Sequence, residues 1–229
     1  MTNAIILLSG GLDSVVSLAS IRSEYSEILA LTFNYGQKSF IAEKNAAEKI
    51  AAFYNIKHKI IDLGWLSEIS TSSLNTIMDV PSLSVSDLEQ VELTHKSSKS
   101  VWVPNRNGLF VNIAGTFAEA LGYDVVIIGA NKEEALTFKD NSIEFINAIN
   151  NSYKNSMNKT VKLIAPLIEL NKSEIVNKGI KLNIPFDLIN SCYVSNINHC
   201  GQCESCVRLI RALEQNGAQD IIEVIFKGK

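Results

Sequence analysis

A glycine-rich turn, Ser9-Gly10-Gly11-Leu12-Asp13-Ser14, is the part of the sequence best suited to bind an anion. It follows an apolar run at residues 4–8 and precedes a helix-like stretch at residues 15–19. Adjacent glycines let the backbone approach an anion closely, and serine hydroxyls and the free N–H groups of a helix start can donate to phosphate oxygens. The turn therefore predicts a phosphate-binding loop. It is not a Walker loop, because the Gly-Lys-Ser/Thr ending is missing. An ordinary turn with Asp13 or Ser14 as the helix cap is the alternative.

The four cysteines form a second group with an evident chemistry, and all of them lie beyond residue 190. Seven residues separate Cys192 from Cys200, and two residues separate each later pair, Cys200 from Cys203 and Cys203 from Cys206. Four thiolates in this pattern suit a tetrahedral zinc ion with Zn–S distances of about 2.3 Å, and Gly201 lets the backbone fold around the metal. The spacing predicts a closed, structural zinc site without a position for water. An iron–sulfur cluster and reduced buried cysteines are the alternatives.

Composition predicts a single soluble α/β domain with a small C-terminal appendage. The 229 residues carry a net charge of −3 and are 46% hydrophobic, which is enough to fill one core. No run of lysine or arginine occurs, so we expect no direct binding of nucleic acid. No apolar stretch reaches about 18 residues and the first strand starts almost at residue 1, so we expect neither a membrane span nor a signal peptide. Clustered cysteines argue against a secreted disulfide protein, and we expect a cytoplasmic location.

Strand-like and helix-like stretches alternate along the chain, which is typical of parallel βαβ units. We expect an open parallel sheet with helices on both faces, a Rossmann-like fold that binds ligands beyond the carboxyl ends of its strands. Ser9, residues 34–36 and residues 129–131 fall at such ends, so three loops converge on one crevice. The strand-like runs are residues 3–8, 28–33, 57–62, 125–129 and 162–170; the helical patterns are near residues 13–23, 38–54, 107–121 and 142–156, with a capping-box start at residues 171–174.

Hydrophobic periodicity fades between residues 66 and 100, where ten serines occur in 35 residues. Long loops in compact domains are often lids, binding loops or disordered connections, so we predict a lid-like loop over the crevice. A solvated connector is the alternative. We divide the chain into a nucleotide-binding domain at residues 1–165 and a C-terminal helical region with the cysteine site at residues 166–229.

The glycine turn is similar to the pyrophosphatase loop of enzymes that split ATP into AMP and pyrophosphate. Together with the cysteines it resembles the 7-cyano-7-deazaguanine synthases, which combine the ATP pyrophosphatase (adenine nucleotide alpha hydrolase-like) fold with a C-terminal four-cysteine zinc site. The resemblance runs almost from end to end of the chain. Its further motifs are residues 33–37 (Phe-Asn-Tyr-Gly-Gln), Arg106-Asn107, Gly129, Ser191-Cys192-Tyr193 and Arg208.

The resemblance implies an enzyme that uses ATP and ammonia to convert 7-carboxy-7-deazaguanine to an amide and then to a nitrile, on the way to modified tRNA bases. A carboxylate is a poor electrophile, so the family makes an acyl adenylate, and ammonia then displaces AMP. The loop has few cationic residues near it, so Mg²⁺ would offset the remaining negative charge of the phosphates, and Asp13 would help to place the ion. The family commonly forms homodimers, and we expect one here.

The family motifs also imply roles for individual residues. Arg106 would contact the phosphate or the substrate carboxylate, because its guanidinium can bind either in a bidentate way; a surface ion pair is the alternative. The residues expected to bind ATP are Ser9, Gly10, Gly11, Leu12, Asp13, Ser14, Phe33, Tyr35, Gly36 and Gly129. Those expected to act in catalysis are Ser9, Asp13 and Arg106, and those expected to bind the substrate are Arg106, Asn107, Glu134, Phe138 and Asp140.

Residues 134–142 depart from the family pattern, a loop of the form Ser-Gly-Tyr-Pro-Asp-Cys-Arg after an acidic residue. Phe138 aligns with the tyrosine and Asp140 with the aspartate, so stacking on the base and hydrogen bonding to it are retained, but the glycine, proline, cysteine and arginine are missing. Ser39 stands where many members have histidine. These changes do not affect the adenylation step. They leave open the second half of the usual reaction and the identity of the amine that attacks the adenylate.

Three other functions are therefore alternatives to nitrile formation with ammonia. The first is conjugation of the deazaguanine carboxylate to a protein or peptide amine, as attributed to relatives in antiphage operons. The second is tRNA modification by a pyrophosphatase-loop enzyme, against which the lack of basic charge argues. The third is a nucleotide-binding module without catalysis.

Overall fold

The computed structural model describes residues 2–194 and 198–226 of the chain. The sheet is parallel throughout, as the sequence predicts, and its five strands have the order β3-β2-β1-β4-β5. Chain order reverses where β1 lies between β2 and β4, which creates a switch point at the carboxyl ends of these strands. The strands are β1 Ala4–Leu7, β2 Ile28–Asn34, β3 Lys57–Asp62, β4 Val125–Ile127 and β5 Lys162–Ile164.

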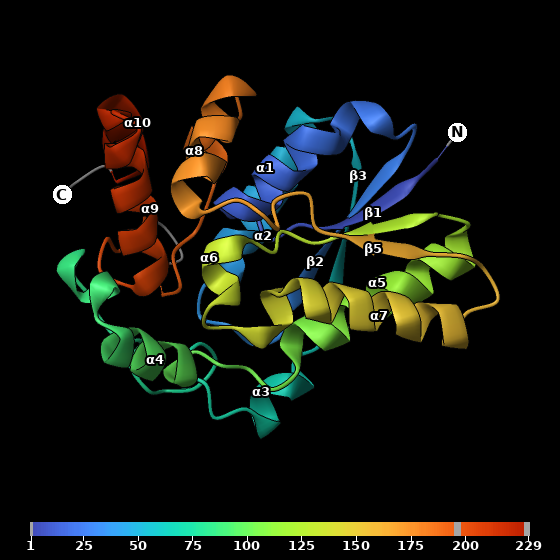
Figure 1. The fold of residues 1–229 in the computed structure, drawn as a ribbon, viewed down its shortest axis with the longest axis horizontal. Helices are drawn as coiled ribbons and strands as arrows, with labels where there is room; N and C mark the ends of the chain where they lie inside the picture. Colours follow the sequence, from blue (N-terminus) through green and yellow to red (C-terminus); the bar gives the residue numbers. More distant parts are fainter. Residues whose placement is uncertain (1, 195–197, 227–229) are drawn as a thin grey trace.

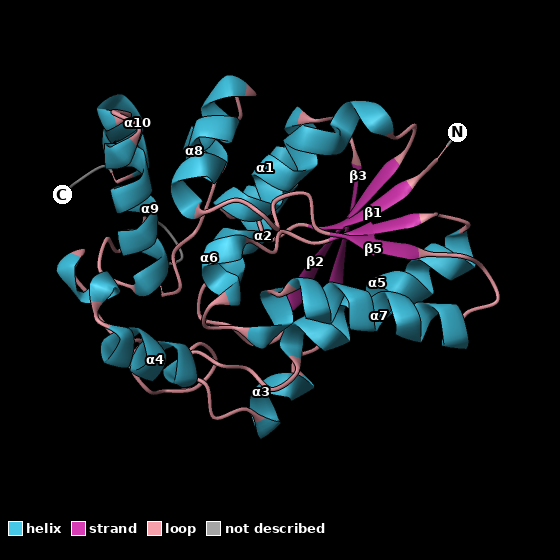
Figure 2. Cartoon of the chain, viewed as in Figure 1, coloured by secondary structure: helices cyan, strands magenta, loops and turns pink. Residues whose placement is uncertain are grey.

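Helices cover both faces of the sheet (Figures 1 and 2). One hydrophobic cluster joins one face of the sheet to α1, α2, α8 and the C-terminal helices, and a second cluster joins the other face to α5 and α7. The central strand supplies both clusters, because its alternate residues point to opposite faces. The helices are α1 Leu12–Ile21, α2 Phe40–Phe53, α3 Trp65–Ile69, α4 Val91–Ser100, α5 Arg106–Leu121, α6 Lys132–Ala135, α7 Ile143–Ser156, α8 Lys172–Lys181, α9 Glu204–Gln215 and α10 Gln219–Ile225.

The C-terminal helices share the core of the sheet. Leu18 on α1, Val176 on α8 and Leu209 on α9 are buried in the same cluster as Ile6 of the central strand. Residues on both sides of position 165 thus contribute to one core, and the division of the chain at that position stays a prediction. Within the described residues, no helix combines the length and the apolar character needed to cross a lipid bilayer.

The serine-rich segment differs from the expectation of an unstructured loop. Val91–Ser100 forms α4, and the buried residues of this helix are Thr94, Ser97 and Ser98 rather than apolar residues. Hydroxyl groups hide the periodicity that normally reveals a helix. Earlier in the same segment, Ser73 donates two hydrogen bonds to the carbonyl of Ser100, one from its backbone N–H at 2.8 Å and one from its hydroxyl at 3.1 Å. The segment is therefore packed and partly helical, while its action as a lid stays a prediction.

The contact between α5 and α7 positions the start of α5 at the carboxyl edge of the sheet. Gly115 of α5 lies so close to α7 that a Cβ there would be 2.6 Å from Met157 Cε and 2.8 Å from Tyr153 Cζ. The tyrosine ring cannot move away easily, because it is buried and its hydroxyl donates to the carbonyl of Val111. This glycine is what allows the two helices to approach each other.

We predict that Gly115→Ala lowers the free energy of unfolding by about 1–3 kcal/mol, the usual cost of overpacking a core. The higher helix propensity of alanine, about 1 kcal/mol, offsets part of the cost. Urea unfolding measures the difference, and Thr116→Ala at the neighbouring exposed position should change the free energy by less than about 0.5 kcal/mol. Equal or greater stability of Gly115→Ala would contradict the packing argument.

Candidate active site

The predicted phosphate-binding loop connects β1 to α1. Gly10 has φ of +77°, and a Cβ at this position would lie 2.6 Å from Ala46 Cβ on α2, so only glycine fits. The Ser9 hydroxyl accepts a hydrogen bond from Gly11 N–H at 3.2 Å, and the Ser14 hydroxyl donates to the carbonyl of Gly11 at 2.9 Å. Gly11 is the N-cap residue, and no side chain caps α1. The alternative of an Asp13 or Ser14 cap therefore does not describe this turn.

A cavity of about 230 Å³ opens beside the loop at the carboxyl ends of the strands. Most of the predicted ATP and substrate residues line it, whereas Gly10, Gly36, Phe138 and Asp140 do not. A Cβ on Gly129 would be 3.0 Å from Ser14 N, so this glycine allows the end of β4 to approach the start of α1. The predicted residues in the wall are Ser9, Gly11, Leu12, Asp13, Ser14, Phe33, Tyr35, Arg106, Asn107, Gly129 and Glu134.

A buried ammonium group joins two of these acidic residues. Lys172 Nζ, at the start of α8, lies 2.7 Å from Asp13 Oδ2 and 2.9 Å from Glu134 Oε1. Its side chain is 7% exposed, and those of Asp13 and Glu134 are 21% and 26% exposed. Burial raises the pKa of Asp13 to about 6, although the lysine opposes the rise. Burial alone would lower the pKa of Lys172, but the two carboxylates raise it overall.

Lys172 was not predicted from the sequence, because it lies 159 positions away from Asp13 and outside the glycine-rich loop. The available signal was its position: it opens the helix that follows β5, at the same edge of the sheet as the loop. Asp13 Oδ1, in contrast, is buried and has no hydrogen-bond partner within the described part of the chain. An unpaired carboxylate oxygen beside a phosphate loop fits a divalent cation such as Mg²⁺.

Arg106 and Tyr35 also line the cavity. Arg106 Nη1 donates to the Tyr35 hydroxyl at 3.3 Å and Nε donates to Asn107 Oδ1 at 3.3 Å. Among the residues described, no carboxylate oxygen lies within 4.0 Å of its guanidinium, so the surface ion pair considered above is not formed. Burial works against the charge, but Tyr35 and Asp140 keep the pKa of Arg106 above its usual value. The guanidinium is thus charged and available to an anionic ligand.

The cavity is also lined by an acidic residue that was not predicted from the sequence. Glu43 lines the cavity, and its carboxylate accepts hydrogen bonds from the Ser39 hydroxyl at 2.6 Å and from Gln37 Nε2 at 2.9 Å. Ser39, one of the departures from the family pattern, is therefore a direct partner of Glu43. Burial raises the pKa of this carboxyl group.

Two of the residues predicted to bind the substrate, Phe138 and Asp140, do not line the cavity. Phe138 stacks on Trp102, with ring centroids 6.3 Å apart and an interplanar angle of 8°. The main-chain carbonyl of Asp140 accepts a hydrogen bond from Asn107 Nδ2 at 3.4 Å, and burial raises the pKa of its carboxyl group. Asn107 links Asp140 to the cavity, whereas Glu134 and Asn141 of the same loop line the cavity directly. The roles of Phe138 and Asp140 in substrate binding stay predictions.

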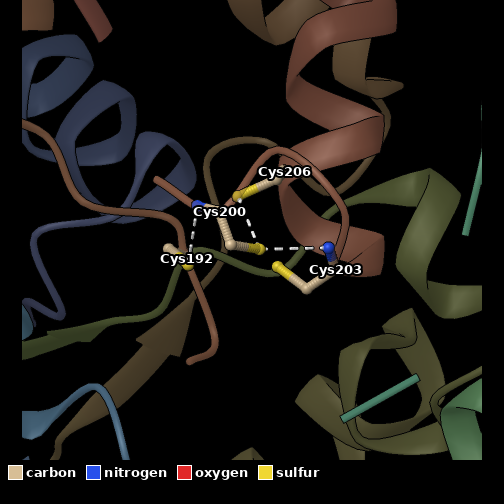
Figure 3. Close-up of side chains that lie close together, drawn as sticks. All are labelled: Cys192, Cys200, Cys203 and Cys206. Atoms are coloured by element: carbon tan, nitrogen blue, oxygen red, sulfur yellow. Dashed lines mark hydrogen bonds between the residues drawn. The ribbon is translucent and has the colours of Figure 1, made fainter. Parts of the chain in front are cut away.

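The four cysteines gather at the start of α9 (Figure 3). Their sulfur atoms all lie within 4.8 Å of one another, and those of Cys200 and Cys206 are 3.9 Å apart. A tetrahedron with Zn–S bonds of about 2.3 Å has S–S edges of about 3.8 Å, so the arrangement fits a four-sulfur metal site. The backbone N–H of Cys200 donates to Cys192 Sγ at 3.3 Å and that of Cys203 donates to Cys200 Sγ at 3.2 Å, which favours thiolates.

His199 lies outside this set of ligands. Its Nε2 accepts a hydrogen bond from the backbone N–H of Ser191 at 3.0 Å, and its ring packs 5.1 Å from that of Phe226. The four sulfur atoms are enough for a tetrahedral ion without a fifth residue, and their role as zinc ligands stays a prediction. We name this group of residues the cysteine centre.

We predict that Lys172→Met lowers the free energy of unfolding by about 3–5 kcal/mol at pH 8, because it leaves two buried carboxylates without a cation. The loss should be smaller at pH 5, since the pKa of Asp13 is raised and the protonated group needs no cation. The sign follows from linkage: a raised folded-state pKa gives stability at low pH that disappears as the pH rises through that pKa. Urea unfolding at both pH values measures the effect.

Lys181→Met is the matched control for this experiment, because Lys181 is exposed at the other end of the same helix. It should leave the free energy of unfolding almost unchanged at both pH values. An equal loss for Lys172→Met at pH 5 and pH 8 would refute the assigned coupling to Asp13.

Comparison with known proteins agrees with this geometry. The family model described as "Queuosine biosynthesis protein QueC" matches residues 3–217. The 7-cyano-7-deazaguanine synthase of Methanosarcina mazei is 46% identical over 222 residues, covering 95% of this chain and 96% of that protein. The enzyme of the same name from Methanosarcina barkeri is 44% identical over 221 residues, covering 95% and 96%.

A solved structure shows the same fold at low sequence identity. A 4-thiouridine synthetase, determined as a complex with RNA and bound ATP, superimposes with a TM-score of 0.52 at 18% identity, and the match covers 99% of this chain and 54% of that one. The fold is that of the ATP pyrophosphatases. With matches of this extent to the family model and to full-length relatives, the chain belongs to the 7-cyano-7-deazaguanine synthase family.

Proposed function

We propose that the protein activates 7-carboxy-7-deazaguanine by adenylation with ATP, forms an amide from the adenylate and, by default, converts it to 7-cyano-7-deazaguanine with ammonia. The observation that carries this proposal is that one cavity is lined by the glycine-rich loop and by Arg106, which forms no ion pair with any of the described residues. The loop offers hydroxyl and N–H donors to phosphate, and Arg106 offers a bidentate fork to the substrate carboxylate. Family membership supports the substrate.

Formation of the amide requires two displacements in sequence. The substrate carboxylate oxygen attacks the α-phosphorus of ATP, the bond to the bridging oxygen breaks, and pyrophosphate leaves. Ammonia then attacks the acyl carbon, loses its proton, and displaces AMP to give the amide. The amide oxygen then attacks the α-phosphorus of a second ATP and expels a second pyrophosphate, and loss of AMP and the two amide protons gives the nitrile. Arg106 holds the carboxylate for the first step, and Ser9 and Ser14 hold the departing phosphates.

Two metals have residues suited to them. Mg²⁺ neutralises charge on the phosphates when it is bound, and Asp13 Oδ1 is the oxygen available to hold it. Zinc suits the cysteine centre, where four sulfur ligands leave no position for water, so its role is structural. We also propose that the protein forms a homodimer, as the family resemblance implies.

One alternative retains the adenylate and changes the acceptor. Residues 134–142 lack the glycine, proline, cysteine and arginine of the family loop, and Phe138 packs on Trp102 instead of lining the cavity. This arrangement favours, as a second candidate, transfer of the acyl group to a protein or peptide amine. Both candidates share the first step; they differ in the amine that attacks the adenylate and in whether the amide is converted further to a nitrile.

Mass spectrometry of the products tests the proposal. The zinc-loaded protein is mixed with Mg-ATP and 7-carboxy-7-deazaguanine, with and without ammonium and with candidate acceptor proteins from its operon. AMP with free 7-cyano-7-deazaguanine supports the default function. AMP with an adenylate, a stable amide or a deazaguanine-tagged protein supports the alternative. No AMP under any condition would refute adenylation.

We predict that Asp13→Asn reduces AMP formation by at least about 100-fold, because it removes the carboxylate that faces both Lys172 and the phosphate site. AMP release in the presence of the carboxylate substrate measures the loss. Asp220→Asn, at an exposed position on α10, is the control and should retain full activity. Activity of Asp13→Asn within about twofold of the unmodified protein would exclude Asp13 from the reaction.

We predict that Cys203→Ser lowers the zinc content from about one ion per chain to nearly none and lowers the melting temperature, because metal binding contributes to folding. Cys203 is the N-cap residue of α9, and serine is itself a good N-cap, so the loss of stability reports the metal rather than the cap. Elemental analysis distinguishes zinc from iron, and calorimetry gives the melting temperature. The control is Gln202→Ala at an exposed position. A metal-free variant as stable as the original would refute a structural role.

A further inference from the structure

The two residues that precede the cysteine centre lie directly on the phosphate loop. The backbone N–H of Asn190 donates to the carbonyl of Gly10 at 2.8 Å. The hydroxyl of Ser191 accepts the N–H of Leu12, the first residue of α1, at 3.2 Å. A Cβ on Gly11 would be 3.4 Å from the carbonyl oxygen of Asn190, so the two chain segments are in van der Waals contact.

Both side chains have donor groups for which residues 2–194 and 198–226 provide no acceptor. Asn190 Nδ2 is buried without a hydrogen-bond partner among the residues described. The Ser191 oxygen is occupied as an acceptor, and its proton has no acceptor within the same residues. Buried polar groups in native structures are nearly always paired, so an orphaned amide donor calls for a specific explanation. A ligand that brings acceptor oxygens provides one.

The surroundings identify the chemical class of this ligand. Asn190 and Ser191 line the cavity together with Ser9, Gly11 and Ser14 of the phosphate loop. These residues carry hydroxyl and N–H groups, of which the Ser14 hydroxyl and the Gly11 N–H already form hydrogen bonds within the loop. The N-terminus of α1 adds its positive dipole end. A polyphosphate offers many acceptor oxygens in a small volume. Neutral donors of this kind bind phosphate without the charge of a lysine.

We propose that Asn190 Nδ2 and Ser191 Oγ complete the phosphate site from the C-terminal side and donate hydrogen bonds to the phosphate oxygens of ATP. The cysteine centre holds them in place. Cys192 follows Ser191 directly, and the Ser191 N–H is bonded to His199 Nε2, next to Cys200 in the sequence. The cysteine centre thus acts on nucleotide binding through position, without contact between the metal and the nucleotide. This inference rests on the proposed use of ATP.

Calorimetric titration of the metal-loaded protein with Mg-ATP, inorganic pyrophosphate and adenosine tests the inference. A hydrogen bond to a charged group is lost in each variant, so Asn190→Ala and Ser191→Ala should each raise the dissociation constants for Mg-ATP and pyrophosphate by about 10-fold to 100-fold. Affinity for adenosine should be unchanged, because adenosine has no phosphate. A purely structural disturbance would weaken all three ligands together.

Three controls make the outcome specific. Ser191→Thr retains the hydroxyl and should restore the affinity for pyrophosphate that Ser191→Ala loses. Ser20→Ala removes a serine hydroxyl at the other end of α1, where it donates to the carbonyl of Val16 at 2.6 Å, and should leave all affinities unchanged. Metal content and melting temperature are measured for every variant, and both should match those of the unmodified protein.

The possible results separate this inference from the proposed function. If Asn190→Ala and Ser191→Ala bind pyrophosphate as tightly as the unmodified protein does, the inference is wrong while ATP use stands. Equal weakening of adenosine and pyrophosphate, or loss of the metal in both variants, also overturns it. If the unmodified protein binds neither ATP nor pyrophosphate, the proposed function fails first and the inference fails with it.

Discussion

The candidate active site depends on one buried cation. Lys172 joins α8 to α1 through Asp13 and to α6 through Glu134, so a single ammonium group fixes the relative positions of three elements. Without it, two carboxylates would share a poorly solvated space, and one of them would take up a proton or move toward water. The phosphate loop therefore has its position because of a residue far away in sequence. The sheet brings these elements to one edge, and the charge holds them there.

A second set of charges extends this arrangement to the cysteine centre. Glu133 and Glu134 are consecutive residues of α6, yet the first pairs with Arg208 and Arg211 on α9 while the second pairs with Lys172 on α8. Arg208 also binds Glu204, which accepts a hydrogen bond from Ser97 of α4 at 2.5 Å. The short helix α6 thus connects α9, which contains Cys206, to α8, which begins with Lys172. The serine-rich segment is attached to the same network.

Most of the fold and part of the site could be predicted from the sequence, because both were encoded locally. Strands β1 and β2 are largely continuous apolar runs, the strands alternate with helical stretches along the chain, and the spacing of the glycines and of the cysteines marks the two candidate sites. Pairs distant in sequence could not be predicted in this way: Lys172 and Asp13 are 159 positions apart. Glu43 was missed because it looks like an ordinary charged residue in the first turn of a helix. Helix α4 was missed because its buried face consists of threonine and serine.

The contact between Gly10 and Ala46 has a consequence for how this family can diverge. Ala46 is buried on α2 and does not line the cavity, yet no room is left between it and the loop. A larger side chain at position 46 would displace the loop, and a side chain at position 10 would displace the helix. Position 10 is therefore expected to remain glycine, because its φ of +77° is strained for any other residue, and position 46 is expected to remain small. A larger residue at position 46, outside the cavity, would change the shape of the loop without changing any residue of the loop itself.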